Sequence, residues 1–137
     1  VERLKNKVEK WIDSRVLDWK GHLKPLNGRK KNIIKKLRMC RGESSYTINK
    51  QTVYLCVKDD KGDYYNDTML MHVLLHELAH AMCSETGHTR LFDDIFSELM
   101  DEAHEPTCSN QYQIYDKHAP LVDNYCGVTK QDTYTVV

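Results

Sequence analysis

Residues 71–80 read MHVLLHELAH, and this stretch decides both the fold and the chemistry that we expect of the chain. It places two histidines, His76 and His80, four residues apart, with Glu77 directly after the first. On an α-helix, residues four apart lie about 40° apart around the axis and about 6 Å apart along it. Two imidazoles in this arrangement can bind one zinc ion at about 2.1 Å each. The stretch therefore predicts a helix that carries an H-E-x-x-H zinc site.

Glu77 has the chemistry of a general base in such a site. Zinc lowers the pKa of a bound water toward about 7, and a neighbouring carboxylate can take the proton of this zinc-activated water and pass it to a leaving amine. Apolar residues surround the motif, and burying polar groups without a partner is costly, so a metal ion would compensate them. The alternative, which stays open, is a pair of hydrogen-bonded core histidines.

A catalytic zinc site needs a third protein ligand and an open position for water. His88 is the leading candidate, because it follows His80 by eight residues and comes directly after Gly87, whose turn can bring the chain back to the metal. The alternatives are carboxylates, of which Glu98 would give a site with two histidines and one glutamate. The full set of alternatives is Glu98, Glu85, Asp93 and Asp94.

Residues that support the site are suggested by residue type alone. His72 lies one turn before His76 and drifts off the metal face, so we expect a structural or supporting role for it. Peptide hydrolysis develops an oxyanion that needs a hydrogen-bond donor besides the metal. The candidate donors are Tyr112, Tyr115, His104 and His118, and Asp93 or Asp94 could orient a ligand histidine.

Hydrophobic periodicity predicts four helices and a few short strands. The helices are expected at residues 1–20, 29–39, 68–83 and 89–103. The strands are expected at residues 45–48 and 52–57, joined by a turn at Asn49-Lys50, with a weaker strand pattern at 112–115. Asn66 or Asp67 suits the N-cap of the long helix, and Gly87 suits its C-terminal end. This order predicts an α+β fold in which a small sheet packs on the H-E-x-x-H helix.

The length of 137 residues favours a single domain spanning residues 1–137. Within it we expect a basic, helical N-terminal part (1–44), a catalytic core (45–127) and a tail (128–137). Charges are segregated, since residues 1–58 carry 16 Lys and Arg against 5 Asp and Glu, while residues 59–137 carry 4 against 15.

The basic segment has three interpretations. It can hold an anionic partner such as DNA in a salt-sensitive contact. Alternatively, the two halves of the chain attract each other, or the charges form solvated helix faces. Trp11 and Trp19 could stack on exposed bases, although tryptophans at helical spacing more often belong to a core.

Cysteine usage favours reduced thiols. The chain has five cysteines and no C-x-x-C pair, which argues against a zinc ribbon and against a fully paired disulfide framework. They are Cys40, Cys56, Cys83, Cys108 and Cys126. Reduced thiols in an intracellular protein are the simplest account. No apolar run approaches the roughly 20 residues of a membrane span, and no signal-peptide pattern is visible. Because the chain begins at a valine, an upstream anchor or signal stays open.

The motif and its surroundings resemble the WLM and SprT-like zinc metallopeptidases. The resemblance lies in the run His76-Glu77-Leu78-Ala79-His80, followed by Gly87-His88-Thr89 and then Phe92. Further segments are similar to the WLM-like proteins of large DNA viruses, namely residues 52–59, Gly62, Tyr64-Tyr65, Asp67 and Asn124-Tyr125-Cys126-Gly127. The resemblance covers about Tyr46 to Gly127.

This resemblance implies a compact, zincin-like peptidase domain of a viral protein. His76, His80 and His88 would be its zinc ligands and Glu77 its general base. It also implies a role in repair of DNA–protein crosslinks, by cleavage of proteins bound or crosslinked to DNA, in the nucleus or at sites of viral replication. Two other functions remain as alternatives: a zinc-stabilised binding module without catalysis, and a DNA-binding protein in which the motif is incidental.

Overall fold

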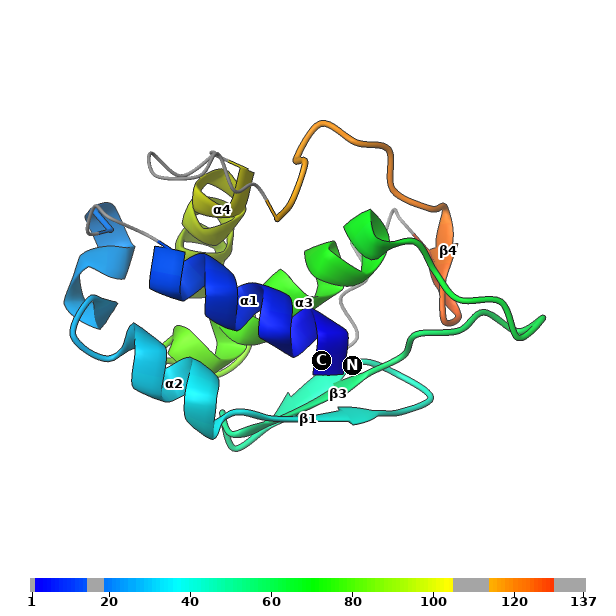
Figure 1. Ribbon diagram of the computed structural model, residues 1–137, viewed down its shortest axis with the longest axis horizontal. Helices are drawn as coiled ribbons and strands as arrows, with labels where there is room; N and C mark the ends of the chain where they lie inside the picture. The colour runs from blue at the N-terminus through cyan, green and yellow to red at the C-terminus, as the bar shows by residue number, and fades with distance from the viewer. Residues whose placement is uncertain (1, 15–18, 105–113, 130–137) are drawn as a thin grey trace.

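A computed structural model describes residues 2–14, 19–104 and 114–129 of the chain (Figure 1). The elements are α1 (Glu2–Ser14), the 3-10 helix η1 (Gly21–Leu26), α2 (Lys30–Lys36), β1 (Arg38–Arg41), β2 (Tyr46–Ile48), β3 (Thr52–Leu55), α3 (Asp67–Met82), α4 (Arg90–His104), β4 (Asn124–Tyr125) and β5 (Val128–Thr129). The expected α+β class with a small sheet is confirmed. Among the described residues, no helix is both long and apolar enough to cross a membrane.

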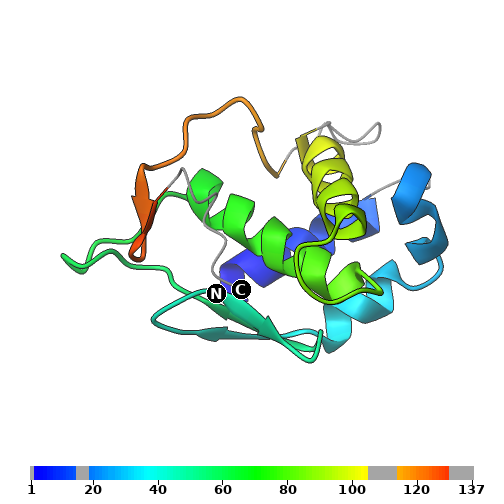
Figure 2. The ribbon, with the colours of Figure 1, turned by 180° about the vertical axis from the view of Figure 1, so that it is seen from behind.

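Helix α3 is the centre of the fold. The Asn66 side chain caps it by accepting a hydrogen bond from the Met69 amide at 2.8 Å, as the sequence predicted. Most of its side chains are buried, because α4 and the sheet lie on opposite sides of it and α1 crosses it on a third (Figures 1 and 2). A helix that is apolar all round belongs in a core. It ends at Met82, well before Gly87, which instead lies in the connection to α4 with φ of +80°.

The sheet has three strands in the order β1-β3-β2. Strand β3 pairs in parallel with β1 and antiparallel with β2. Its alternate residues Val53 and Leu55 are buried, and both β2 and β3 contact α3. The turn predicted at Asn49-Lys50 joins β2 to β3, with φ of +51° and +57° at these two residues. The sheet therefore packs on the side of α3 that carries Glu77, which the Thr47 hydroxyl of β2 contacts.

Two of the predicted helices are longer than the helices in the structure. The second helix was expected to reach Met39, but α2 ends at Lys36 and residues 38–41 form β1, because parallel pairing with β3 outweighs the helical pattern. The first helix was expected to reach Lys20, but residues 19 and 20 are not helical. There the Asn27 side chain both accepts from the Trp19 amide and donates to the Trp19 carbonyl, which occupies the groups a helix would use. Residues 15–18 lie outside the described part.

The tryptophans belong to the core and are not free to stack on bases. Trp11 and Trp19 are 0% and 1% exposed, and their ring centroids lie 5.8 Å apart. The Lys30 ammonium sits 4.6 Å above the Trp19 ring, so this cation is also turned inward. The packing interpretation of both tryptophans is therefore correct.

The expectation of reduced cysteines is wrong for one pair. Cys56 at the end of β3 forms a disulfide with Cys126 in the β4–β5 turn. Beside it the Tyr125 hydroxyl donates to the Cys56 carbonyl and lies 2.8 Å from the Ser45 hydroxyl. The disulfide and the Tyr125 hydrogen bond hold the β4–β5 hairpin against the sheet. Local sequence patterns cannot reveal this contact, because the two cysteines are 70 residues apart.

Of the three other cysteines, two lie in the part of the chain that the structure describes. Cys40 and Cys83 have free thiols, whereas Cys108 lies outside the described residues. Of the strand expected at residues 112–115, the described residues Ile114 and Tyr115 are not in a strand, since both amides bond to the Ala103 carbonyl at the end of α4.

Candidate metal centre

Three histidine side chains converge beside α3. His76 and His80 come from successive turns of the helix, and His88 comes from the connection that leads into α4. The Nε2 atom of His88 lies 3.1 Å from that of His80 and 3.3 Å from that of His76. Ligand atoms at about 2.1 Å in a tetrahedron around zinc are about 3.4 Å apart. The spacing of the three nitrogens thus fits a single metal ion.

The electrostatics of the cluster suit a cation. Burial, with smaller contributions from the neighbouring histidines, lowers the pKa of His76 to about 3, so its imidazole is neutral at physiological pH. A neutral imidazole carries the lone pair that a metal ligand needs. Three ring nitrogens so close together cannot all satisfy one another by hydrogen bonding, whereas one divalent cation can satisfy all three.

Two phenylalanines of α4 form an apolar wall around the imidazoles. The Phe92 ring stacks on His80 at 4.2 Å between centroids and meets the rings of His76 and His88 edge-on at 5.0 Å. Phe96 meets the His76 ring edge-on at 5.1 Å. These contacts fix the ring orientations, and they explain why α4 must pack against α3 for the cluster to exist.

Glu77 lies at the edge of the cluster and does not join it. Its side chain is 2% exposed, and its Oε2 atom is 4.0 Å from Nε2 of His76. The Thr47 hydroxyl on β2 donates to the other carboxylate oxygen, Oε1, at 2.7 Å. Burial raises the pKa of Glu77 to about 7, against a smaller lowering by the Thr47 hydrogen bond. A carboxyl group that titrates near neutrality, beside a metal position, can both take and give a proton.

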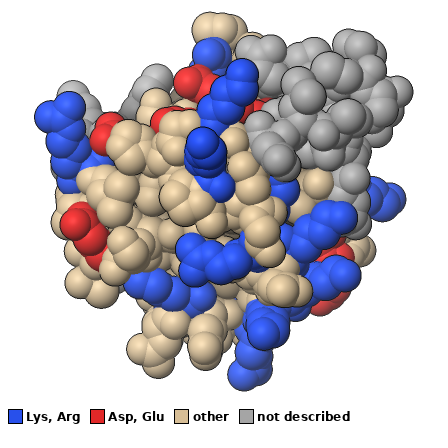
Figure 3. Space-filling model, turned by 90° about the vertical axis from the view of Figure 1, so that its left-hand side faces the viewer, with Lys and Arg blue, Asp and Glu red and all other residues tan. Residues whose placement is uncertain are grey.

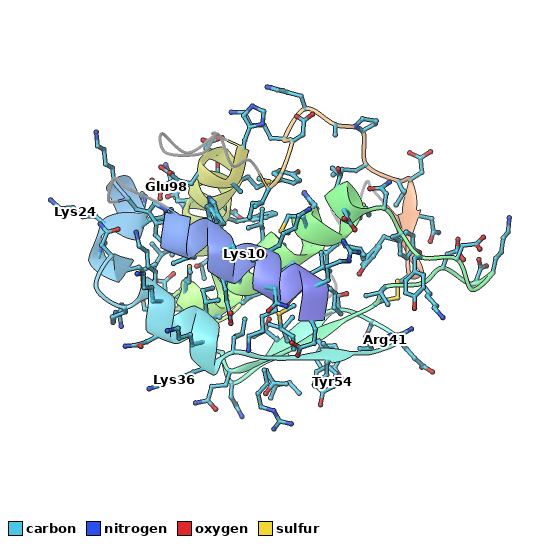
Figure 4. The ribbon with its side chains drawn as sticks, viewed as in Figure 1. Lys10, Lys24, Lys36, Arg41, Tyr54 and Glu98 are labelled. Atoms are coloured by element: carbon cyan, nitrogen blue, oxygen red, sulfur yellow. A yellow bond between two sulfur atoms is a disulfide. The ribbon has the colours of Figure 1, made fainter. Side chains whose placement is uncertain are left out.

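The alternative third ligands lie elsewhere. The Glu98 carboxylate accepts hydrogen bonds from the His22 amide at 3.1 and 3.2 Å, and faces η1 (Figure 4). It also packs on Gly21, where an added Cβ would lie 2.3 Å from Glu98 Oε1. Asp94 lies 3.7 Å from His22 and 4.0 Å from Arg90. Neither these carboxylates nor the exposed Glu85 and Asp93 belong to the histidine cluster, so the sequence preference for His88 agrees with the geometry.

His72 has the supporting place expected for it. Its Nδ1 atom lies 3.0 Å from the Tyr115 hydroxyl, and its ring packs on Phe96. Burial lowers the pKa of His72 to about 4. Among the candidate oxyanion donors, Tyr115 is therefore engaged by His72. His104 and His118 pack together at the end of α4, about 18 Å along the helix from Phe92, and Tyr112 lies outside the described residues.

Sequence reasoning missed two residues of the β2–β3 hairpin. Thr47 contacts Glu77, and the Lys50 ammonium donates to the carbonyls of His80 and Glu85. Nothing in the local pattern marks them, because their roles depend on how the sheet packs on α3. The turn signal at Asn49-Lys50 was visible, but not the direction in which the lysine points.

Comparisons with known proteins find viral relatives. The chain is 44% identical over 109 residues to uncharacterized protein 136R of Invertebrate iridescent virus 6, a match that covers 77% of this chain and 57% of that protein. It is 40% identical to uncharacterized protein 042R of Invertebrate iridescent virus 3 (79% and 64%), and 33% identical to uncharacterized protein R325 of Acanthamoeba polyphaga mimivirus (81% and 56%).

The chain thus spans less than two thirds of the length of each of these three relatives. No family model matches it, and no solved structure matches it. The expectation of a viral protein is supported, because all three relatives come from viruses. Their names state no activity, and any functional proposal has to come from the chemistry of the site.

Proposed function

We propose that this chain is a zinc-dependent endopeptidase, with His76, His80 and His88 as zinc ligands and Glu77 as general base. The observation that carries the proposal is the combination of three convergent imidazoles with a buried carboxylate 4.0 Å from one of them that is not itself a ligand. A structural zinc site normally has four protein ligands and no use for a base. A catalytic site has three, with a base beside the open position.

Each residue has a defined task in peptide hydrolysis. A zinc ion held by the three imidazoles would supply Lewis-acid chemistry, making water a better nucleophile at neutral pH. Thr47 holds Oε1 of Glu77 and leaves Oε2 on the side of His76, where Glu77 would take a proton from water and later deliver it to the leaving amine. Phe92 and Phe96 exclude other water from the ring faces of the ligands.

An extended peptide suits the strand beside Glu77. Strand β2 is at the edge of the three-stranded sheet, so one of its sides is unpaired within the part of the chain that the structure describes. The Thr47 hydroxyl also lies 3.2 Å from the backbone carbonyl of Glu77, which places strand β2 beside the base. Peptides commonly bind by adding a strand to such an edge. This favours a protein substrate over a small molecule.

The test is cleavage of an unstructured protein such as casein, and of histones, by the zinc-loaded chain. We expect cleavage that is abolished by a chelator, restored by zinc, and reduced by at least about 100-fold in Glu77→Gln while zinc remains bound. Zinc binding without cleavage, and with no difference between the wild type and this variant, would favour the alternative of a zinc-stabilised module that binds a partner without catalysis.

We further propose that the basic part of the chain binds nucleic acid, which would direct the peptidase to DNA-associated or DNA-crosslinked proteins. Residues 19–42 contain nine Lys and Arg and no Asp or Glu. Figure 3 shows Lys and Arg gathered on this side of the molecule, and Lys24 and Lys36 extend away from the ribbon in Figure 4. No ion pair within the described residues joins the following exposed cations to a carboxylate: Lys20, Lys24, Arg29, Lys35, Lys36, Arg38 and Arg41.

Ion pairs between the two halves of the chain therefore neutralise few of the cations in residues 19–42. The two halves do meet at α1, where Arg3 pairs with Asp67 at 2.6 Å, but not at these exposed cations. The described large apolar residues that are exposed are Ile48 and Tyr64, neither of which lies in residues 19–42, so this face suits a phosphate backbone more than a lipid surface.

Binding to DNA across a salt series would test this second proposal. Lys35→Glu with Lys36→Glu should weaken binding and lower the salt slope by about 2, whereas the control pair Lys58→Glu with Lys61→Glu, which changes charge equally, should not. Absence of binding to single- and double-stranded DNA at low salt would refute it. If both proposals hold, WLM or SprT-like membership and action inside the cell on DNA-linked proteins become the favoured assignment.

A further inference from the structure

The turn between β2 and β3 has an unusual residue at its second position. Asn49 and Lys50 both have left-handed backbone conformations, with φ of +51° and +57°. The Gln51 amide bonds to the Ile48 carbonyl, so Asn49 and Lys50 are the two central residues of a β-turn, and with positive φ at both such turns favour glycine, asparagine or aspartate over residues such as lysine. A lysine that persists in such a conformation points to a task for its side chain.

The Lys50 ammonium makes two hydrogen bonds to backbone carbonyls. It donates to the His80 carbonyl at 2.8 Å and to the Glu85 carbonyl at 2.9 Å. The His80 carbonyl lies in the last turn of α3, where carbonyl groups lack helical partners and a positive charge is favourable. The Glu85 carbonyl lies in the connection from α3 to α4, three residues before His88.

One side chain therefore joins the backbones of the two segments that bring His80 and His88 together. Within the part of the chain that the structure describes, no other hydrogen bond reaches residues 84–87. The side chains of Ser84, Glu85, Thr86 and His88 are exposed, so packing does little to hold this connection. The position of His88 then depends on the packing of its ring and on the Lys50 contact.

We propose that Lys50 is a positioning residue, which holds the connection of residues 83–89 against the end of α3 and so presets the three-histidine cluster for a divalent metal ion. This inference rests on the proposed metal site. Without the ammonium, the connection samples other conformations, and binding the metal has to order it first. The positive φ of Lys50 is then tolerated because it brings the Lys50 ammonium within hydrogen-bonding distance of the His80 and Glu85 carbonyls.

Three substitutions of Lys50 distinguish a residue that positions the connection of residues 83–89 from one that only forms the β2–β3 turn. Lys50→Met removes the donors but keeps the length of the side chain. Lys50→Gly removes the donors and relieves the backbone strain. Lys50→Arg keeps charge and donors. Lys61→Met, at an exposed lysine of another turn, is the matched control.

The measurements are the zinc dissociation constant, by competition with a chromophoric chelator, and amide hydrogen exchange of the metal-free protein. We expect Lys50→Met and Lys50→Gly to weaken zinc binding by about 10- to 100-fold, the usual effect of removing a group that orients metal ligands. Lys50→Arg and Lys61→Met should stay close to wild type. Exchange at the Cys83 amide, which bonds to the Ala79 carbonyl where the connection leaves α3, should be faster in the Met and Gly variants, while the thermal midpoint of the Gly variant should not fall.

The outcomes distinguish this inference from the proposed function. Tight zinc binding by the wild type, with unchanged affinity in the Met and Gly variants, overturns the positioning role alone. A lower thermal midpoint in Lys50→Met with unchanged zinc affinity would also overturn it, because that is the signature of a turn residue. Unchanged exchange at the Cys83 amide overturns the contact of Lys50 with the connection as a restraint, whatever the metal does. No zinc binding by the wild type would refute the metal site on which the inference rests.

Discussion

Replacing Glu77 by glutamine should have opposite effects on stability and on activity. The carboxyl group is buried, and its hydrogen bond from Thr47 compensates only part of the cost of ionisation. Glutamine has the same shape, can still accept the Thr47 hydrogen bond, and carries no charge. The variant should therefore be more stable than the wild type and, under the proposed mechanism, inactive, because the buried charge would serve catalysis at the expense of folding.

The size of the stability effect follows from the pKa of Glu77 in the metal-free protein. Burial raises this pKa from 4.5 to about 7. Because the folded state holds the proton more tightly than the unfolded state, the wild type loses no stability from this group below pH 4.5, and loses it progressively as the pH rises to 7. A shift of this size corresponds to about 3 kcal/mol above pH 7. For a chain of this length that is a difference of about 10 °C in Tm.

Urea unfolding of the chelator-treated wild type and Glu77→Gln, from pH 4 to 9, would measure this difference. The buried histidines titrate in both proteins, so subtracting the two curves isolates Glu77. The two free energies of unfolding should coincide near pH 4 and separate as the pH rises, with the variant the more stable. Parallel curves, or a variant less stable than the wild type at pH 8, would show that the carboxylate is adequately paired and that the burial argument is wrong.

Three further predictions concern the third ligand, the disulfide and acid stability. His88→Ala should lose zinc by elemental analysis, whereas Glu98→Ala should retain it, and the reverse result would transfer the ligand role to the carboxylate. Cys56→Ser with Cys126→Ser opens a cross-link between residues 70 apart, which should lower the free energy of unfolding under oxidising conditions by about 4 kcal/mol; equal stability would show that the bond does not form. Because burial lowers the pKa of His72 from 6.5 to about 4, the metal-free protein should lose stability as the pH falls through this range, by about 3 kcal/mol from this group. His72→Gln should flatten that loss in acid unfolding curves, and an unchanged acid limb would refute the assignment.

The sequence predicted the parts of the site that lie on one helix. The spacing of His76 and His80 fixes their relative direction once the segment is helical, and the apolar residues around them make the helix certain to be buried. His88 was also predictable, because a short connection with Gly87 leaves few places for the next side chain to go. These inferences need only local geometry.

The sequence could not predict contacts that depend on packing between distant segments. Strand β1 was mistaken for the end of a helix, since the only strand that pairs with it among the described residues is β3, and that pairing is parallel. The disulfide was missed for the same reason, because cysteine counting says nothing about which thiols meet. Thr47 and Lys50 also belong to this class, since each reaches α3 or its connection across 30 residues or more.

The division between predictable and unpredictable residues follows the chemistry that each group supplies. Metal-binding side chains are few in type and must be close in space, so their spacing leaves a mark in the sequence. Hydroxyl and ammonium donors that orient them are common residues, and any strand that packs on the helix could provide one. In this chain a single hairpin provides both: Thr47 holds the carboxylate, and Lys50 holds the connection to His88. The β2–β3 hairpin is therefore as much a part of the candidate site as α3 itself, and variants along it should alter metal affinity and turnover without touching a ligand.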